Sequence, residues 1–193
     1  MPELTLAQDP DDDEVLSDNP LALLIGMLLD QQVPMERAFA APAELERRIL
    51  APIDAGTIAA YDADLLVGLF STPPALCRYP KAMAERVQAL CAAIVADHDG
   101  EAENIWDGVA TGQEVLARLQ ALPGFGKQKA QIFTALLGKQ CHVTPEGLRE
   151  AAGSYGDADA RRSIADVVDP ATLAEVREFK QAQKKAAKEA AGR

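Results

Sequence analysis

The stretch Leu119–Ala130, with the sequence LQALPGFGKQKA, limits the fold more than any other part of the chain. Pro123 cannot continue a helix interior, and Gly124 and Gly126 can adopt backbone angles that other residues avoid. An apolar helical pattern precedes this break, and a second one begins at Lys127. The stretch therefore predicts two helices joined by a tight hairpin.

The predicted hairpin has the chemistry of a phosphate-binding element. The first N–H groups of a helix have no partner within it, and the helix dipole adds positive potential there, so such an end binds anions. Lys127, Lys129 and Lys139 lie in or after the hairpin, and no acidic residue occurs between Val115 and Pro145. A plain corner inside a hydrophobic core is the alternative interpretation, but the basic surroundings favour phosphate.

LPGFGKQKA resembles the helix-hairpin-helix motif of the HhH-GPD superfamily of base-excision DNA glycosylases. That superfamily includes endonuclease III and the adenine-mismatch and 3-methyladenine glycosylases. The resemblance implies an all-α, two-lobed helical fold with double-stranded DNA as its partner. It also implies that the hairpin binds the DNA backbone, with a monovalent cation as a possible aid. The residues so implied are Gly124, Phe125, Gly126, Lys127 and Lys129.

A second motif occurs in the order and spacing of the same superfamily. NPLALLIGMLLD predicts a central buried helix that is capped by Asp18 or Asn19. The segment LLDQQVPMERA that follows resembles the one after the superfamily's first core helix. This resemblance assigns Gln32, or Gln31, as the residue that wedges into the duplex when the target base leaves the stack. A glutamine amide can donate and accept hydrogen bonds in that gap. A helix end that merely reaches water is the alternative.

Two catalytic positions of the superfamily carry different residues here. The match places Gln128 where bifunctional members have a lysine nucleophile, and glutamine cannot form an imine, so we expect no β-lyase activity. In CHVTPEGLREAAG, Thr144 takes the place of the aspartate that stabilises the oxocarbenium-like sugar. Glu146, eighteen residues after Gln128, is the candidate replacement, and Asp30, next to the proposed wedge, is the other contender, although a charge there could instead cap the helix. In the alternative interpretation, Thr144, Pro145 and Glu146 are simply the start of a helix.

The resemblance implies a monofunctional DNA glycosylase that hydrolyses the N-glycosidic bond of a damaged or mismatched base. A non-catalytic DNA-binding module that kept the hairpin is the rival prediction, and a scaffold whose hairpin binds protein is a third. Many members of the superfamily carry a C-terminal iron–sulfur loop with four cysteines, but no cysteine follows Cys141 here, so we expect no such cluster. The two histidines, His98 and His142, have no ligand spacing, so we expect no metal bound by side chains and no cofactor beyond the hairpin cation.

The charge of the chain is unevenly distributed. The formal net charge of its 193 residues is −11, but residues 1–20 hold seven acidic and no basic side chains, whereas residues 177–193 hold six basic and two acidic ones. We expect residues 1–17 to be flexible, 18–180 to form one helical domain of two lobes, and 181–193 to be a basic helical or frayed tail. No apolar run approaches the ~18 residues of a membrane span. We therefore expect a cytoplasmic, nucleoid-associated monomer.

Overall fold

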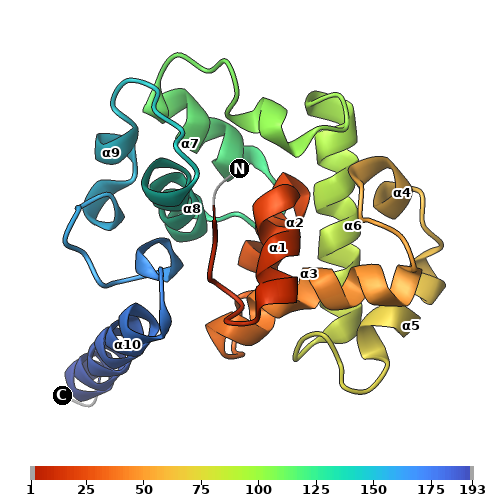
Figure 1. The fold of residues 1–193 in the computed structure, drawn as a ribbon, viewed down its shortest axis with the longest axis horizontal. Helices are drawn as coiled ribbons and strands as arrows, with labels where there is room; N and C mark the ends of the chain where they lie inside the picture. The colour runs from red at the N-terminus through yellow and green to blue at the C-terminus, as the bar shows by residue number, and fades with distance from the viewer. Residues whose placement is uncertain (1–2, 192–193) are drawn as a thin grey trace.

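The computed structural model of the protein describes residues 3–191, and within them every regular element is a helix (Figure 1). The predicted all-α class is confirmed. None of the helices in this range combines the length and the apolar character that crossing a membrane requires. In chain order the elements are α1 (Pro10–Asp18), α2 (Pro20–Leu29), α3 (Met35–Ile49), α4 (Ala55–Ala59), α5 (Ala63–Ser71), α6 (Pro80–Asp97), η1 (Ala102–Ile105), α7 (Gly112–Ala121), α8 (Lys127–Gln140), α9 (Leu148–Ala151), η2 (Gly153–Tyr155), η3 (Ile164–Asp166) and α10 (Pro170–Ala191).

Helix α2 is the centre of the fold. Asn19 caps it by accepting two N–H groups of the first turn, at 3.0 and 3.4 Å, and Pro20 takes the first helical position. Every residue in Leu21–Leu29 is buried. A Cβ added at Gly26 would lie 2.7 Å from the ring of Phe39, so glycine lets α3 cross α2 closely. The sequence prediction of a capped, central, buried helix is confirmed.

The remaining helices pack on different sides of α2. Helices α4, α5 and α6 lie to the right in Figure 1, and α8, α9 and α10 lie to the left. Contacts from α2 to α3, α6 and α8 join the two groups. Because α8 follows the predicted hairpin, this arrangement brings the hairpin against the C-terminal end of α2.

The described part of the N-terminus is ordered, contrary to the expectation of a flexible acidic segment. Leu4 and Leu6 are buried in the core. Asp9 caps α1 by accepting two N–H groups of its first turn, and the carboxylate of Asp13 accepts the N–H of Ala7 at 2.7 Å. Carboxylates at a helix start satisfy free N–H groups and complement the dipole. The acidic residues that suggested disorder therefore fix the segment instead.

Helix α10 begins packed on the body and ends in solvent. Leu173 and Val176 are buried, whereas the side chains of residues 181–189 are all exposed. Figure 1 shows the helix leaving the body toward the C-terminus. Of the two alternatives for the basic tail, the structure has the helical one, up to Ala191.

Candidate nucleic-acid interface

The predicted hairpin joins α7 to α8. The N–H of Phe125 donates to the carbonyl of Leu122 at 3.1 Å and closes the turn. Gly124 has φ +83°, and a Cβ there would lie 2.3 Å from Cδ1 of Leu28 in α2. Both the backbone angle and the close approach require glycine at this position. The predicted break between two helices is confirmed.

The hairpin leaves the N-terminus of α8 open. Gly126 precedes its first turn, and no side chain of the described residues caps this end. A Cβ added at Gly126 would meet nothing within 4 Å, so the space in front of the helix is free. Lys127 is exposed and makes no hydrogen bond or ion pair with the described residues. Within the described residues, this end of α8 therefore offers N–H groups without a side-chain cap and the exposed ammonium group of Lys127 in its first turn.

Phe125 is not available to a ligand, which corrects its assignment to the DNA contact. Its side chain is 3% exposed and packs edge-on against Phe133, with 5.9 Å between the ring centres. Phe125 anchors the turn in the core because an apolar ring gains more from burial than from contact with phosphate.

Lys129 is also not aimed at phosphate, contrary to the expectation. Its ammonium group donates to the carbonyl oxygens of Met27, at 2.5 Å, and Leu28, at 2.7 Å. These are carbonyls of the last turn of α2, which have no partner within that helix. Burial lowers the pKa of Lys129 to about 8, while the nearby charge of Asp30 opposes this shift. Lys129 therefore caps α2 and joins it to α8.

Lys139 has a structural role too. Its ammonium group lies 2.5 Å from the carboxylate of Asp166, which is buried, and it also donates to the carbonyl of Asp157. These contacts hold the segment before α10 against α8. Of the three lysines that suggested phosphate binding, Lys127 alone is free for it within the described residues.

The loop after α2 carries Gln32, four residues after Leu28, which contacts the hairpin. Gln32 is exposed in the left-handed conformation, with φ +58°, and its Oε1 accepts from Arg78 at 2.7 Å. Gln31 turns back instead, and its Nε2 donates to the carbonyl of Leu28 at 3.1 Å. Of the two glutamines considered as the wedge, Gln32 has the exposed position, and Gln31 stabilises the end of α2.

Sequence analysis missed the residues that adjoin Gln32 from the start of α6. The guanidinium group of Arg78 lies 5.3 Å from the ring centre of Tyr79, and the tyrosine is 47% exposed. Arg86, about two turns into α6, contributes to the lowered pKa of Lys129 and so lies near it. The Arg-Tyr-Pro sequence directly before an amphipathic helix is the signal that could have identified this group.

The carboxylate of Asp30 lies at the C-terminal end of α2, two residues before Gln32. The side chain of Asp30 is 15% exposed, and its Oδ2 lies 3.8 Å from Nζ of Lys180 in α10. Its charge also favours the ammonium form of Lys129. Asp30 is thus a partly buried anion between two amines, next to the loop that carries Gln32.

The structure does not bring Glu146 and Thr144 to the hairpin. The backbone of Glu146 pairs with the loop before α7, through its carbonyl to Gly112 at 2.8 Å and its N–H to Ala110 at 3.2 Å. The hairpin lies at the other end of α7, roughly 15 Å away for ten helical residues. Thr144 lines cavities at the C-terminal half of α8.

The expectation that Glu146 delivers a carboxylate next to Gln128 is therefore wrong in this geometry. No helix starts at Pro145 either, because extended pairing engages the backbone of Glu146, and α9 begins only at Leu148. Gln128 lies in the first turn of α8, and its Nε2 donates to the hydroxyl of Tyr155 at 2.9 Å.

The hairpin backbone has oxygen atoms of the kind that bind a monovalent cation. The carbonyl oxygens of Pro123 and Gly124 accept no hydrogen bond from the described residues. Backbone carbonyl oxygens can replace the hydration shell of such an ion. These two oxygens would hold the cation at the turn. Among the described residues, no group of three or more His, Cys, Asp or Glu side chains has the arrangement of a metal site.

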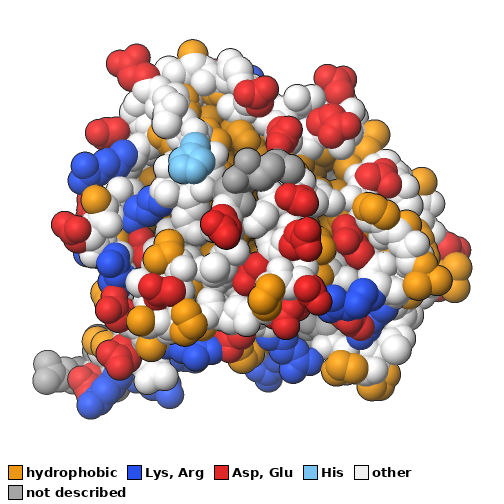
Figure 2. Space-filling view, viewed as in Figure 1, with side chains coloured by type: hydrophobic (Ala, Val, Ile, Leu, Met, Phe, Trp, Pro, Cys, Tyr) orange, Lys and Arg blue, Asp and Glu red, His pale blue; other side chains and the backbone are white. Residues whose placement is uncertain are grey.

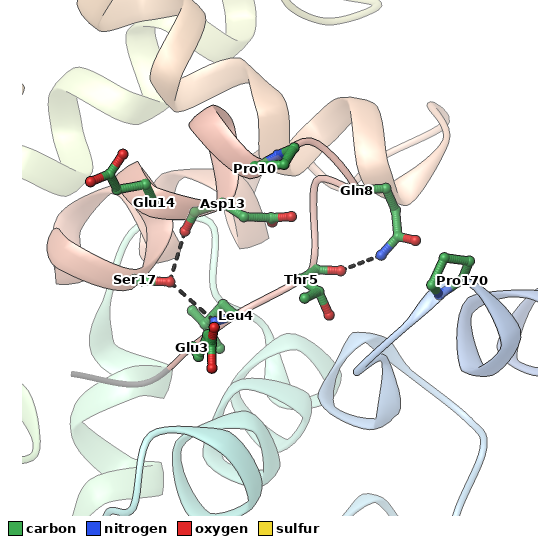
Figure 3. Close-up of a pocket in the computed structure, with 9 residues that line it drawn as sticks. All are labelled: Glu3, Leu4, Thr5, Gln8, Pro10, Asp13, Glu14, Ser17 and Pro170. Atoms are coloured by element: carbon green, nitrogen blue, oxygen red, sulfur yellow. Dashed lines mark hydrogen bonds between the residues drawn. The ribbon is translucent and has the colours of Figure 1, made fainter.

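A cavity of about 710 Å³ lies away from the hairpin, between the N-terminal segment, α1 and Pro170 (Figure 3). The carboxylates of Glu3, Asp13 and Glu14 line it, and burial raises the pKa of Asp13. Such a lining repels phosphate. Figure 2 shows acidic side chains over the face that carries α1, whereas Lys and Arg gather along the lower edge and on α10. The net charge of −11 is therefore compatible with a basic surface elsewhere.

Comparison with known proteins found no relative of the chain. No protein-family model, no curated protein and no solved structure matches the chain.

Proposed function

We propose that the chain is a double-stranded-DNA-binding protein of the base-excision-repair type, with the two-lobed HhH-GPD arrangement. The observation that carries this proposal is that the open N-terminus of α8 is held against the last turn of α2, from which the chain continues into the loop with the exposed Gln32. Gly124 and Lys129 fasten these two features together through contacts with the last turn of α2. One rigid unit thus carries a phosphate-binding end and a polar side chain suited to a gap in the duplex.

In this proposal, the amides of the first turn of α8 and the ammonium group of Lys127 bind phosphates of one strand. Each phosphate contact releases a counterion, so affinity falls as salt rises. Gln32 enters the stack, where its amide offers a donor and an acceptor to the base left without a partner. Arg78 holds the amide of Gln32 in free protein and is released to a phosphate or a base edge.

We further propose that the reaction is hydrolysis of an N-glycosidic bond, with Asp30 as the carboxylate. As the C1′–N bond breaks, its electron pair leaves with the base and the sugar becomes positively charged. Asp30 is partly buried beside the wedge loop, where an anion stabilises that charge. Water then bonds to C1′, and its proton goes to the base that left with the electron pair, so the products are the free base and an abasic sugar. Gln128 cannot form an imine, and Lys129 is engaged by two carbonyls, so β-elimination is not part of the proposal.

A non-catalytic DNA-binding module is the second candidate. The observation that favours it is the position of Thr144 and Glu146, which lie at the far end of α7 and α8 from the hairpin. In that case Asp30 acts only as an ion-pair partner of Lys180.

One experiment separates these candidates. The protein is incubated with labelled duplexes that each carry one damaged or mismatched base, and the products are treated with alkali and resolved by size. Strand breaks that depend on one lesion support the glycosylase, and breaks without alkali would contradict monofunctional hydrolysis. Salt-dependent binding without breaks across the panel supports the module. Absence of binding to every duplex at low salt overturns DNA as the partner.

A further inference from the structure

We propose that α10 is a second DNA-binding element, and that Lys184 and Lys188, which continue the row that Lys180 starts at Asp30, follow the phosphates of the duplex beside the hairpin. This inference rests on the proposed function, because it extends the same interface. It adds a surface that neither the hairpin motif nor the wedge loop contains.

The first half of α10 is fixed at the edge of the candidate interface. Arg177 pairs with Glu36 at the start of α3, and Lys180 lies 3.8 Å from the carboxylate of Asp30. Arg162 stacks over the ring of Phe179, with 5.6 Å from its guanidinium carbon to the ring centre. The helix therefore leaves the body from the same loop region that carries Gln32.

The second half of α10 offers a partner only alanine and polar or charged side chains, and three of these are lysines. After Phe179 the sequence has no apolar side chain larger than alanine. The side chains of residues 181–189 are exposed. A helix surface without large apolar side chains gains little by burial in a hydrophobic groove. Its partner must therefore be recognised through the lysines.

The lysines are arranged as a stripe and not as a ring. Residues four apart lie on one face of a helix, roughly 6 Å from each other along its axis. Lys180, Lys184 and Lys188 follow this spacing, and Lys180 starts the row at Asp30. Lys185 lies about 100° away from the middle of the row, on the side that carries Glu178 and Glu189. A row of ammonium groups that begins at the wedge loop is complementary to a phosphate strand.

Single variants at matched lysines test the stripe. Binding of the full chain to a 20-base-pair duplex is measured by fluorescence anisotropy over a series of salt concentrations. Lys184→Ala and Lys188→Ala are each expected to lower the slope of log K against log salt by about 0.9, as for the loss of one phosphate contact. Lys185→Ala removes the same charge from the same helix and is expected to leave the slope unchanged. Circular dichroism checks that all three variants keep the helix.

The outcomes separate the stripe from the hairpin. Equal slopes for all three variants and the unaltered chain overturn the role of α10. Equal losses at Lys184, Lys185 and Lys188 overturn the stripe in favour of a non-specific basic tail. If Lys127→Ala lowers the slope while the α10 variants do not, the inference fails and the proposed function stands. If no variant changes the slope, both fail. Unchanged DNA binding with loss of binding to vesicles of anionic lipid would assign the stripe to a membrane surface instead.

Discussion

The ammonium group of Lys129 lies 2.7 Å from the carbonyl oxygen of Leu28, a residue 101 positions earlier in the chain. The last carbonyls of a helix have no partner within it, and an ammonium group at that end also complements the dipole. Lys129 therefore fixes the start of α8 to the end of α2. The open helix terminus is consequently held next to the end of α2, where the loop with Gln32 begins.

Lys127 and Lys129 are expected to differ in DNA binding although both follow the hairpin glycines. Lys127→Met should lower the slope of log K against log salt by about 0.9, because its exposed ammonium group is free to contact a phosphate. Lys129→Met should leave the slope unchanged, because its ammonium group faces the carbonyls of α2. Anisotropy titrations with one duplex measure both variants. A loss of slope at Lys129 alone would reverse the two assignments.

The buried amine of Lys129 predicts a specific dependence of stability on pH. Burial lowers its pKa from 10.5 to about 8. Between these values the unfolded chain binds a proton that the folded chain does not, so this group's contribution to stability rises with pH. Below about pH 8 the amine is charged in both states, and the full cost of burying that charge is present.

The measurement compares urea unfolding of the unaltered chain and of Lys129→Met at pH 7, 8.5 and 10. Other titrating groups are common to both proteins, so the difference in unfolding free energy isolates Lys129. The unaltered chain should gain stability relative to the variant from pH 8.5 to 10. A constant difference over this range would show that Lys129 titrates at its ordinary pKa.

The two hairpin glycines are expected to tolerate alanine very differently. Gly124→Ala places a Cβ at positive φ and 2.3 Å from Cδ1 of Leu28, which is fully buried. Strain and overpacking together should cost about 2–5 kcal/mol of stability. Gly126→Ala meets no atom within 4 Å and should cost no more than about 1 kcal/mol, as a weaker N-cap. Chemical denaturation measures both, and similar losses would contradict the packing described for the turn.

The features that could be predicted from the sequence alone are those determined by nearby residues. Pro123, Gly124 and Gly126 determine the hairpin through their own backbone preferences, and Asn19 with Pro20 determines the start of α2. Residues within a few positions of each other determine these features, so the features can be recognised in the sequence without knowledge of the fold.

Long-range partners could not be predicted in the same way. Lys129 and Lys139 were assigned to phosphate because no acidic partner lies near them in the sequence. Their actual partners, the carbonyl of Leu28 and the carboxylate of Asp166, are far away along the chain. Glu146 was placed by its separation from Gln128, but its backbone pairs with the loop before α7 instead. Composition misled for the N-terminus, since a count of acids does not reveal that they cap a helix.

The two candidate carboxylates, Asp30 and Glu146, make opposite predictions for excision. Asp30 lies at the end of α2, next to the wedge loop, whereas Glu146 lies beyond the far end of α7. On a duplex that the lesion panel identifies as a substrate, Asp30→Asn should lower single-turnover excision by at least ~10², because a preorganised anion beside the developing charge is lost. Glu146→Gln should leave excision within about twofold, since its exposed side chain is remote from the hairpin.

Both substitutions preserve size and remove one negative charge, so each is the control for the other. Duplex affinity should be kept or slightly raised in Asp30→Asn, because repulsion of phosphate falls and Lys180 is freed from its partner. The thermal midpoint of each variant is recorded with the rate, so that a loss of fold is not mistaken for a loss of chemistry. Near-normal excision by Asp30→Asn would remove Asp30 as the catalytic carboxylate. A hundredfold loss in Glu146→Gln with an unchanged midpoint would restore the assignment based on sequence spacing.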